Sequence, residues 1–566
     1  MPHKTYSYRN IWKVAYPILI SLVMEQMIGL TDTAFLGRVG EIELGASAIA
    51  IIYYMVLFMI GFGFSIGAQI IIGRRNGEGK FRETGKVFWN GLYFVLGLSG
   101  ALILLSELFS PWIMKSMVSS AAIYDAALSY VRWRLPGMVF AFCTAMFRAF
   151  YIGTTQTKTL TFNSIVMVAS NVIFNWILIF GKFGMPALGI TGAAIGSSLA
   201  ELVSLIFFVA YTRCCCDRVR YGLDKAAKLD TAEIKGMMPV CSWTMIQHVI
   251  SLSTWLIFFL YIEHLGERAL AISNIARSLS GIMWVVLSAF SSTCSTLVSN
   301  IIGEGHQDKV MSLVKRILKI SYAVISVMII LFCLFPEAMA RIYTDIPDLI
   351  VASVPSLIVM TSAYFVNVGG QVLFLAVSGT GSTKTAFRLE LVALTAYMIY
   401  CTVIVGILKC DVAICWTAEH VYGGVLLICS WWYMRSGRWK NRSIRDNPDL
   451  ESDQPVAAYR AGTHMIYRIF RLRSSRLARE SRSIRITGIH KLQQIVRQHM
   501  FQKKVEAVTM VMMPQMTEFM EHDIVAKGLR KTHEVQIEVD VCLGRAAAPV
   551  GRIMLDCHAV ILKSIT

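Results

Sequence analysis

Long apolar stretches recur along residues 12–434, and each is long enough to cross a lipid bilayer. About twenty apolar residues in a helix span the roughly 30 Å hydrocarbon core of a bilayer. Lipid offers backbone N–H and C=O groups no partner, so such stretches must be helical. With 55% apolar and 16% charged residues, the composition also excludes an ordinary soluble domain. The sequence therefore predicts an all-α polytopic membrane protein with twelve transmembrane helices, at residues 12–36, 46–73, 86–106, 124–152, 160–181, 188–212, 236–263, 269–302, 316–335, 349–378, 386–408 and 413–434.

Two short peptides return at one fixed distance, which indicates an internal duplication. Residues 153–159 (GTTQTKT) return as residues 379–385 (GTGSTKT), 226 positions later (379 − 153). Residues 77–79 (GEG) return as residues 303–305 at the same offset (303 − 77). Each half holds six spans, an even number, so both halves enter the membrane in the same orientation. We therefore expect two six-helix lobes related by an internal repeat, with the substrate site at their interface.

The spans and the charge distribution set the expected boundaries. We predict a first lobe over residues 1–213, a cytoplasmic linker over 214–235, a second lobe over 236–435 and a basic tail over 436–566. The tail has 22 Lys/Arg and 13 Asp/Glu, so it supplies +9 (22 − 13) of the net charge of +18. Two interpretations of the tail stay open, a disordered cytoplasmic segment that touches anionic lipid headgroups and an extension that is not native. No nucleic-acid recognition motif accompanies the charge.

Basic residues are distributed unevenly over the short loops. Lys and Arg cluster at residues 74–86, 213–235, 309–319 and 384–388, and the alternate connections carry few. Cytoplasmic loops of membrane proteins are enriched in Lys and Arg. We therefore expect both termini in the cytoplasm and a location in the plasma (cytoplasmic or inner) membrane.

Two carboxylates interrupt the first apolar stretch. Glu25 and Asp32 are seven residues apart, so they share one helix face about two turns from each other. An ionisable side chain inside a span is costly and marks a functional site by default. Burial favours the neutral form of a carboxyl group, which suits a group that binds and releases a proton. We predict that Asp32 and Glu25 couple transport to H+ or Na+, and we expect no cofactor and no metal beyond sodium at Asp32.

Uncharged polar residues inside other spans are further site candidates. Amides in a span either line a polar site or join helices. We predict a first-lobe polar network of Gln26, Asn163, Asn171 and Asn175, and second-lobe polar candidates Gln247, His248, Asn367 and Gln371. Glu201, Glu390 and Glu419-His420 are additional ionisable candidates within spans.

Several motifs occur in the order found in one transporter family. They are Pro17 to Asp32-Thr33 in the first span, the repeated GEG of residues 77–79, Gly153-Thr154, and residues 188–194 (LGITGAA). Together with the duplication, they make residues 10–435 resemble the multidrug and toxic compound extrusion (MATE) transporters. The resemblance implies two six-helix lobes that rock around a central cavity. It also implies export of amphipathic, mostly cationic compounds in exchange for protons or sodium ions.

The resemblance also implies roles at particular positions. Asp32 falls on the family's cation-coupling carboxylate in the first span, and Asn171 falls on an asparagine of its fifth-span network. The chain departs from the pattern at Asn175, where many bacterial members have an aspartate. It departs again at Gln247 and Asn367, where the sodium-coupled branch has a glutamate and an aspartate. The resemblance therefore implies that cation coupling resides in the first lobe.

Other classes of function fit the sequence less well. A nucleotide-driven pump needs a phosphate-binding loop, but residues 379–385 lack the Gly before Lys384. We find no Ser/His/Asp or similar catalytic motif and expect no enzyme, and a non-transporting scaffold would tolerate loss of the Asp32 charge. A flippase for lipid-linked saccharides is the alternative that stays open; it would favour cavity cations such as Arg148 and Arg277. We expect a monomer whose partners are small organic cations and the lipid bilayer, not nucleic acid.

Overall fold

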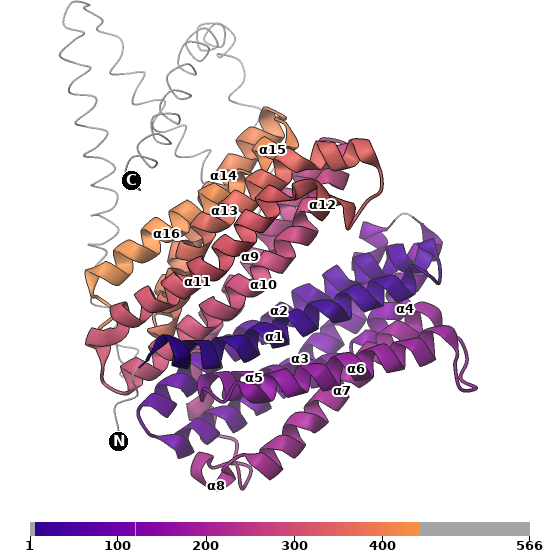
Figure 1. Cartoon of the computed structure of the whole chain (residues 1–566). Coiled ribbons are helices and arrows are strands. Elements are labelled where there is room, and N and C mark those ends of the chain that lie inside the picture. Colours follow the sequence, from indigo (N-terminus) through magenta and orange to yellow (C-terminus); the bar gives the residue numbers. More distant parts are fainter. Residues whose placement is uncertain (1–5, 119, 441–566) are drawn as a thin grey trace, which may run out of the picture. The chain divides into compact units, whose positions relative to one another are not determined.

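The computed structural model describes residues 6–118 and 120–440, which form helices, turns and loops and no strand. The long helices of the first half are α1 (Tyr8–Leu36), α2 (Glu41–Gly77), α3 (Phe81–Met117), α4 (Ala121–Arg134), α5 (Gly137–Gly153), α6 (Lys158–Phe180) and α7 (Gly189–Cys215). Those of the second half are α9 (Thr231–Glu263), α10 (Glu267–Gly303), α11 (Val310–Leu334), α13 (Pro347–Gly379), α14 (Thr383–Cys401) and α16 (Ala418–Ser436). Short segments connect or extend them: α8 (Arg218–Tyr221), η1 (Gln307–Lys309), α12 (Pro336–Arg341), η2 (Thr402–Ile407) and α15 (Val412–Cys415) (Figure 1).

Twelve candidate membrane spans are present in the described part of the chain. Eleven are helices long and apolar enough to cross a membrane, and α4 with α5 makes a twelfth that is bent by 50°. The predicted all-α polytopic fold is confirmed, and the predicted span 124–152 proves to be broken in the middle. Pro136 stands at the break, between the two helices. Proline lacks an N–H and its ring clashes with the preceding turn, which bends a helix.

Each half of the chain packs into its own group of helices. In the first half, α6 lies against α1 and α7, and α2 lies against α4 and α5. In the second half, α13 lies against α10, α11 and α16, and α14 lies against α16 and α9. Figure 1 shows the first group in indigo to magenta and the second in pink to orange. We call these groups the first lobe (α1 to α7) and the second lobe (α9 to α16).

The two lobes meet where α2 packs against α9 and α10. Gly77 lies so close to α10 that a Cβ atom there would stand 2.0 Å from the carbonyl oxygen of Asn300. Gly303 makes the reciprocal contact, since its Cβ would stand 2.3 Å from the carbonyl oxygen of Arg74. Only glycine permits backbones to approach this closely. The repeated GEG peptides of the sequence therefore mark the crossing point of the two lobes.

Side-chain hydrogen bonds join the same ends of the helices. Gln69 donates to Thr296 Oγ1 at 2.9 Å, and Asn76 donates to Asn300 Oδ1 at 2.7 Å. These residues precede the Lys/Arg-rich loops in the chain, so this interface lies at the end of the lobes that carries the basic loops. We call it the basic end, and the other side of the spans the opposite end.

Residues ahead of α1 also reach the second lobe. The Tyr6 hydroxyl donates to Glu304 Oε1 at 3.0 Å, and Arg316 donates to the Tyr6 carbonyl oxygen at 2.8 Å. Burial raises the pKa of Tyr6, and the nearby Glu304 carboxylate raises it further. The hydroxyl therefore stays protonated and available as a donor across the lobe boundary.

The segment between the lobes folds against the first lobe. Tyr221 of α8 is buried against the rings of Phe81 and Phe150, and Gln156 donates to its hydroxyl at 3.0 Å. Asp230 then caps the first turn of α9 through two backbone N–H groups. Of the predicted tail, residues 441–566 lie outside the described residues.

Candidate functional site

Asp32 lies in the last turn and a half of α1, where that helix packs against α6 and α7. Its side chain is buried, with 8% of the residue exposed. Asn175 of α6 donates to one carboxylate oxygen at 2.5 Å, and Ser197 of α7 donates to the other at 3.2 Å. Both oxygens of a charged group inside a span are thus hydrogen-bonded, which offsets part of the cost of its burial.

Asn171 closes this network one helical turn before Asn175. Asn175 donates to Asn171 Oδ1 at 3.3 Å, and Asn171 donates to Ser197 Oγ at 3.2 Å. Helix α7 can come this close because residue 196 is glycine: a Cβ there would stand 2.2 Å from Asn175 Oδ1. We call Asp32, Asn171, Asn175 and Ser197 the Asp32 cluster.

A buried ion pair stands beside the Asp32 cluster. Arg134, the last residue of α4, pairs with Glu201 of α7, and both are at least nine-tenths buried. The Arg134 guanidinium also lies 4.3 Å from the centre of the Tyr54 ring, a cation–π contact. Its charge acts on Asp32 as well. Arg134 thus lies directly before the break, two residues ahead of Pro136.

Glu25 belongs to a separate network. Its carboxylate pairs with Arg148 of α5 and accepts a hydrogen bond from Ser21 at 3.2 Å. Ser21 in turn lies 2.7 Å from Ser164 of α6. The structure thus gives Glu25 its own counter-charge, and no hydrogen bond given for the described residues joins it to Asp32. Its predicted coupling role stays a prediction.

Two other predicted first-lobe residues lie apart from the Asp32 cluster. Asn163 is buried and exchanges two hydrogen bonds with Ser204, at 2.9 and 3.0 Å, which fastens α6 to α7. Gln26 is exposed on α1. The structure therefore brings together three of the predicted positions, Asp32, Asn171 and Asn175.

The predicted second-lobe residues do not form one cluster. Gln247 and Asn367 are buried, and the carbonyl oxygen of each amide has no hydrogen-bond partner among the described residues. His248 Nδ1 lies 2.8 Å from the Thr244 carbonyl oxygen. Gln371 donates to the hydroxyl of Tyr422 at 3.3 Å. Polar atoms of this lobe are thus buried with part of their hydrogen-bonding capacity unused.

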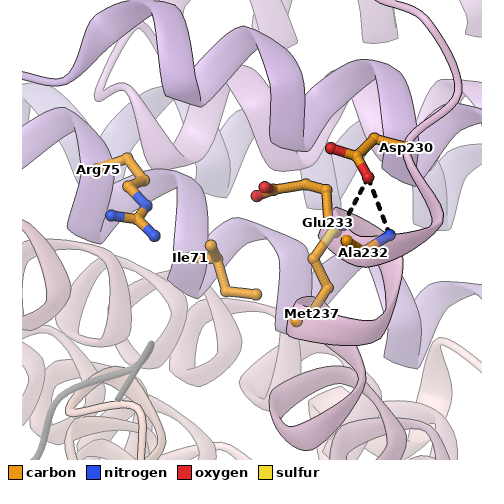
Figure 2. A pocket seen from close by; sticks show the side chains of 7 residues that line it. Ile71, Arg75, Asp230, Ala232, Glu233 and Met237 are labelled. Carbon is orange, nitrogen blue, oxygen red and sulfur yellow. Dashed lines mark hydrogen bonds between the residues drawn. The ribbon is translucent and has the colours of Figure 1, made fainter. Parts of the chain in front are cut away.

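A cavity of about 130 Å³ opens at the basic end, between α2 and the start of α9. Figure 2 shows Arg75 and Ile71 on one side and Asp230, Glu233 and Met237 on the other. The Asp230 carboxylate is occupied as the cap of α9. Drug-sized ligands fill pockets of roughly 300 to 1,000 Å³, so we do not assign this cavity a substrate.

Three residues of the site were not selected from the sequence. Ser197 is one of several serines in its span, and nothing in the sequence distinguishes it from Ser198. Nothing in the sequence around Tyr54 indicates that its ring contacts a cation. Arg134 did offer one, since an ionisable residue within a predicted span marks a functional site.

Comparison with known proteins identifies the fold. A family model for MatE matches residues 17–177 and 244–403, more than half of the chain. The chain belongs to the MATE family. Each match covers one lobe, and the two end 226 residues apart (403 − 177), the offset of the repeated peptides. Members of the MATE family are transport proteins, so this chain is an integral membrane transporter.

The chain is similar to several characterised or named proteins. It is 24% identical to the probable multidrug resistance protein NorM of Thermotoga maritima, over 77% of this chain and 94% of that protein. A MOP superfamily transporter from Pyrococcus furiosus, described by the reverse polarity of its binding pocket, superposes with a TM-score of 0.69 at 16% identity, covering 77% of this chain and 97% of that one. The Vibrio cholerae MATE transporter VcmN in its bent form gives 0.68 at 15% identity, covering 77% and 98%. These likenesses confirm the predicted two-lobe, twelve-helix architecture.

Proposed function

We propose that this MATE transporter is a multidrug efflux antiporter that exports amphipathic organic cations in exchange for protons, with Asp32 as the coupling carboxylate. The observation that carries the proposal is the Asp32 cluster: a buried acid held by donors from two other helices, α6 and α7. Relatives named for multidrug resistance support the substrate class.

The cluster suits a proton better than a sodium ion. Asn175 and Ser197 both direct donor groups at the Asp32 oxygens. A sodium ion needs several oxygen ligands at once, so the Asn175 amide would have to turn its N–H group away from Asp32 and the Ser197 hydroxyl would have to rotate. A proton binds to one carboxylate oxygen and displaces only the donor at that oxygen. Ser197 is the donor with the longer hydrogen bond. Protonation then removes the negative charge that an organic cation would require.

Competition at Asp32 gives the exchange its direction. A deprotonated Asp32 attracts a cationic substrate, and a protonated Asp32 releases it. A difference of about 1.4 kcal/mol between the two states changes substrate occupancy tenfold. Proton entry from the outside therefore discharges the substrate there, and loss of the proton to the cytoplasm prepares the carboxylate for the next substrate.

The lobe contacts support an outward-facing arrangement. The basic loops favour a cytoplasmic position for the basic end and for both termini, in the plasma (inner) membrane. Lobe-to-lobe hydrogen bonds in the described residues gather at that end, through Gln69, Asn76 and Tyr6. Asp32, near the far end of α1, lies toward the opposite end, where a substrate would leave.

A flippase for lipid-linked saccharides fits the charges less well. Such a substrate carries a pyrophosphate and needs cations that are available to bind it. Arg148, one of the two cations that the sequence suggested for this role, is paired with Glu25, and the buried Arg134 is paired with Glu201. Arg277 is exposed on α10 and donates to Asn274. Arg134 and Arg148 therefore each already have a carboxylate partner.

The test is efflux from proteoliposomes loaded with ethidium, a permanently charged organic cation. An inward proton gradient should drive efflux by the wild type, and an inward sodium gradient alone should not. Asp32→Asn should abolish proton-driven efflux while it reconstitutes to the same protein density. Gln26→Ala, on the exposed face of α1, is the control and should keep efflux. Asn163→Asp is unsuitable as a control, because Asn163 joins two helices. Proton-driven efflux by Asp32→Asn at the wild-type rate would overturn the proposal.

A further inference from the structure

We propose that the second lobe contains a second proton-binding site, formed by Glu390 of α14 and Glu419 of α16. The inference rests on the proposed antiport function and extends it to the second lobe, where the sequence offers Glu390 and Glu419 as ionisable candidates but the predicted coupling residues, Asp32 and Glu25, do not lie. The site would raise the number of protons that enter for each substrate exported.

The internal repeat relates Glu390 to a known part of the first lobe. Glu390 lies 226 positions after Ser164 (390 − 164), counted in the register of the repeated peptides. Both positions contact a serine on the first helix of their lobe. Ser164 lies 2.7 Å from Ser21, and Glu390 accepts a hydrogen bond from Ser251 at 2.6 Å. The same place in the second lobe therefore holds a carboxylate instead of a hydroxyl.

The second lobe lacks the arginine that neutralises the first-lobe acid. Arg148, the partner of Glu25, lies 226 positions before Phe374 (374 − 148), which is buried in α13. No ion pair given for the described residues includes Glu390 or Glu419. An isolated carboxylate is too costly to bury, so it takes up a proton instead.

Buried acceptor oxygen atoms on α14, α13 and α9 have no hydrogen-bond partner among the described residues. Glu390 is 4% exposed, and its Oε2 has no hydrogen-bond partner in the part of the chain that is described. The same holds for Asn367 Oδ1, which points at α16: a Cβ on Gly423 would stand 1.9 Å from it. Gln247, one turn before Ser251 on α9, is the third. Glu390 Oε2 is therefore buried without a donor, and a proton is the positive species that it can bind without a cavity.

Each acid accepts a hydrogen bond from a tyrosine at the contact between α14 and α16. Tyr422 donates to Glu390 at 3.4 Å, and Tyr397 donates to Glu419 at 3.5 Å. The two tyrosine rings meet edge to face, with centres 6.1 Å apart. Glu419 is the second residue of α16 and lies nearer the opposite end, and Glu390 lies deeper, in α14, so a proton from that end would reach Glu419 first.

No Lys or Arg forms an ion pair with either acid among the described residues, and His420, which follows Glu419, has its Nε2 3.0 Å from Ser362 Oγ. Tyr422 interacts electrostatically with both acids. Tyr397, Tyr364 of α13 and Cys401 of α14 interact electrostatically with Glu419. From α9 the neighbour is the neutral Ser251. Tyrosine and cysteine are neutral near pH 7 unless strongly perturbed. Proton uptake at the carboxylates is therefore the means left to balance this charge.

The decisive experiment measures proton stoichiometry in ethidium-loaded proteoliposomes. Two protons entering for one monovalent cation leaving make transport electrogenic, so an inside-negative potential should accelerate efflux by the wild type. Glu390→Gln should move one proton, become electroneutral and lose its response to the potential. Glu390→Asp should recover the response. The inference is overturned if Glu390→Gln keeps the wild-type voltage dependence.

A second measurement does not depend on transport. Infrared spectra of purified protein should show protonated carboxyl C=O absorption near neutral pH, reduced in Glu390→Gln and in Glu419→Gln. Unchanged absorption in both variants would contradict the site even if a variant were inactive. If the wild type shows no proton-driven efflux while these bands change as expected, the proposed antiport function fails and the proton site stands.

Discussion

Among single residues, the carboxylates within the spans of the first lobe are stabilised in two ways. Glu25 and Glu201 each have an arginine, whereas Asp32 is held by neutral donors. A carboxylate paired with arginine keeps its charge over a wide pH range, but one held by amide and hydroxyl groups exchanges protons more readily. This contrast is the reason that we propose Asp32, and not Glu25 or Glu201, as the coupling acid of the first lobe.

Ser197→Ala tests whether the donors at Asp32 matter for transport. A hydrogen bond to a charged group contributes about 1.5–3 kcal/mol, so loss of this one should slow proton-driven efflux roughly tenfold. Ser198→Ala is the matched control, because the Ser198 hydroxyl bonds to the backbone oxygen of Ala194 at 2.8 Å. Equal efflux rates for the two variants would remove Ser197 from the mechanism.

The Glu25–Arg148 pair should act in stability more than in coupling. Glu25→Gln leaves a buried guanidinium without its partner and should cost about 2 kcal/mol, between the values for exposed and fully buried pairs. Replacing both residues by glutamine should restore part of that loss. Thermal unfolding in detergent measures both variants. Strictly additive losses in the double variant would show that the pair does not interact.

The sequence predicted the residues of this site that a single helix reveals, and missed those that depend on helix packing. Asp32 was found because a charge in a span is costly, and Asn171 and Asn175 because their spacing places both on one helix face. The partners Ser197 and Arg134 come from distant spans, and their proximity depends on how α4 and α7 pack. The periodicity of residues along a single helix does not predict how separate helices pack against each other.

At the scale of elements, apolar length predicted the helices well, but the break in residues 124–152 escaped prediction. Pro136 marks that break, yet Pro17, Pro111 and Pro239 lie inside α1, α3 and α9 without dividing them. Neighbouring helices compensate for a lost backbone hydrogen bond in some positions and not in others. A proline in the sequence therefore permits a break without deciding it.

Gly77→Ala tests the crossing of α2 and α10. The new Cβ would stand 2.0 Å from a backbone oxygen of α10, so the lobes must separate locally and both the unfolding temperature and the efflux rate should fall. Gly97→Ala in α3 is the control, because no atom lies within 4 Å of its Cβ position. There alanine should stabilise the helix by about 0.5–1 kcal/mol. A Gly77→Ala protein as stable and active as Gly97→Ala would refute this packing.

At the scale of the whole molecule, the duplication explains both the likeness and the difference of the lobes. The family model matches once in each half, and the repeated glycines of the two halves meet at the basic end. The same register places an acid where the other lobe has a serine and a phenylalanine where it has an arginine. Sequence repetition thus predicted the architecture, while the chemistry of each lobe depends on where the repeat diverges.

Alternating access requires the basic end to open during each cycle. Asn76→Cys with Asn300→Cys puts two thiols where the side chains now bond at 2.7 Å. Oxidation should join the lobes and stop ethidium efflux, and a reductant should restore it, whereas either single cysteine should leave efflux insensitive to oxidation. Undiminished efflux by the cross-linked protein would mean that this contact persists throughout the cycle.

Proton release on substrate binding is the most direct measure of coupling at Asp32. Purified transporter in weakly buffered detergent solution is mixed with ethidium while the pH of the medium is recorded. If Asp32 alternates between a proton and a cation, the wild type releases protons as ethidium binds, and Asp32→Asn releases fewer at equal occupancy. The same proton release from both proteins at equal occupancy would contradict coupling through Asp32.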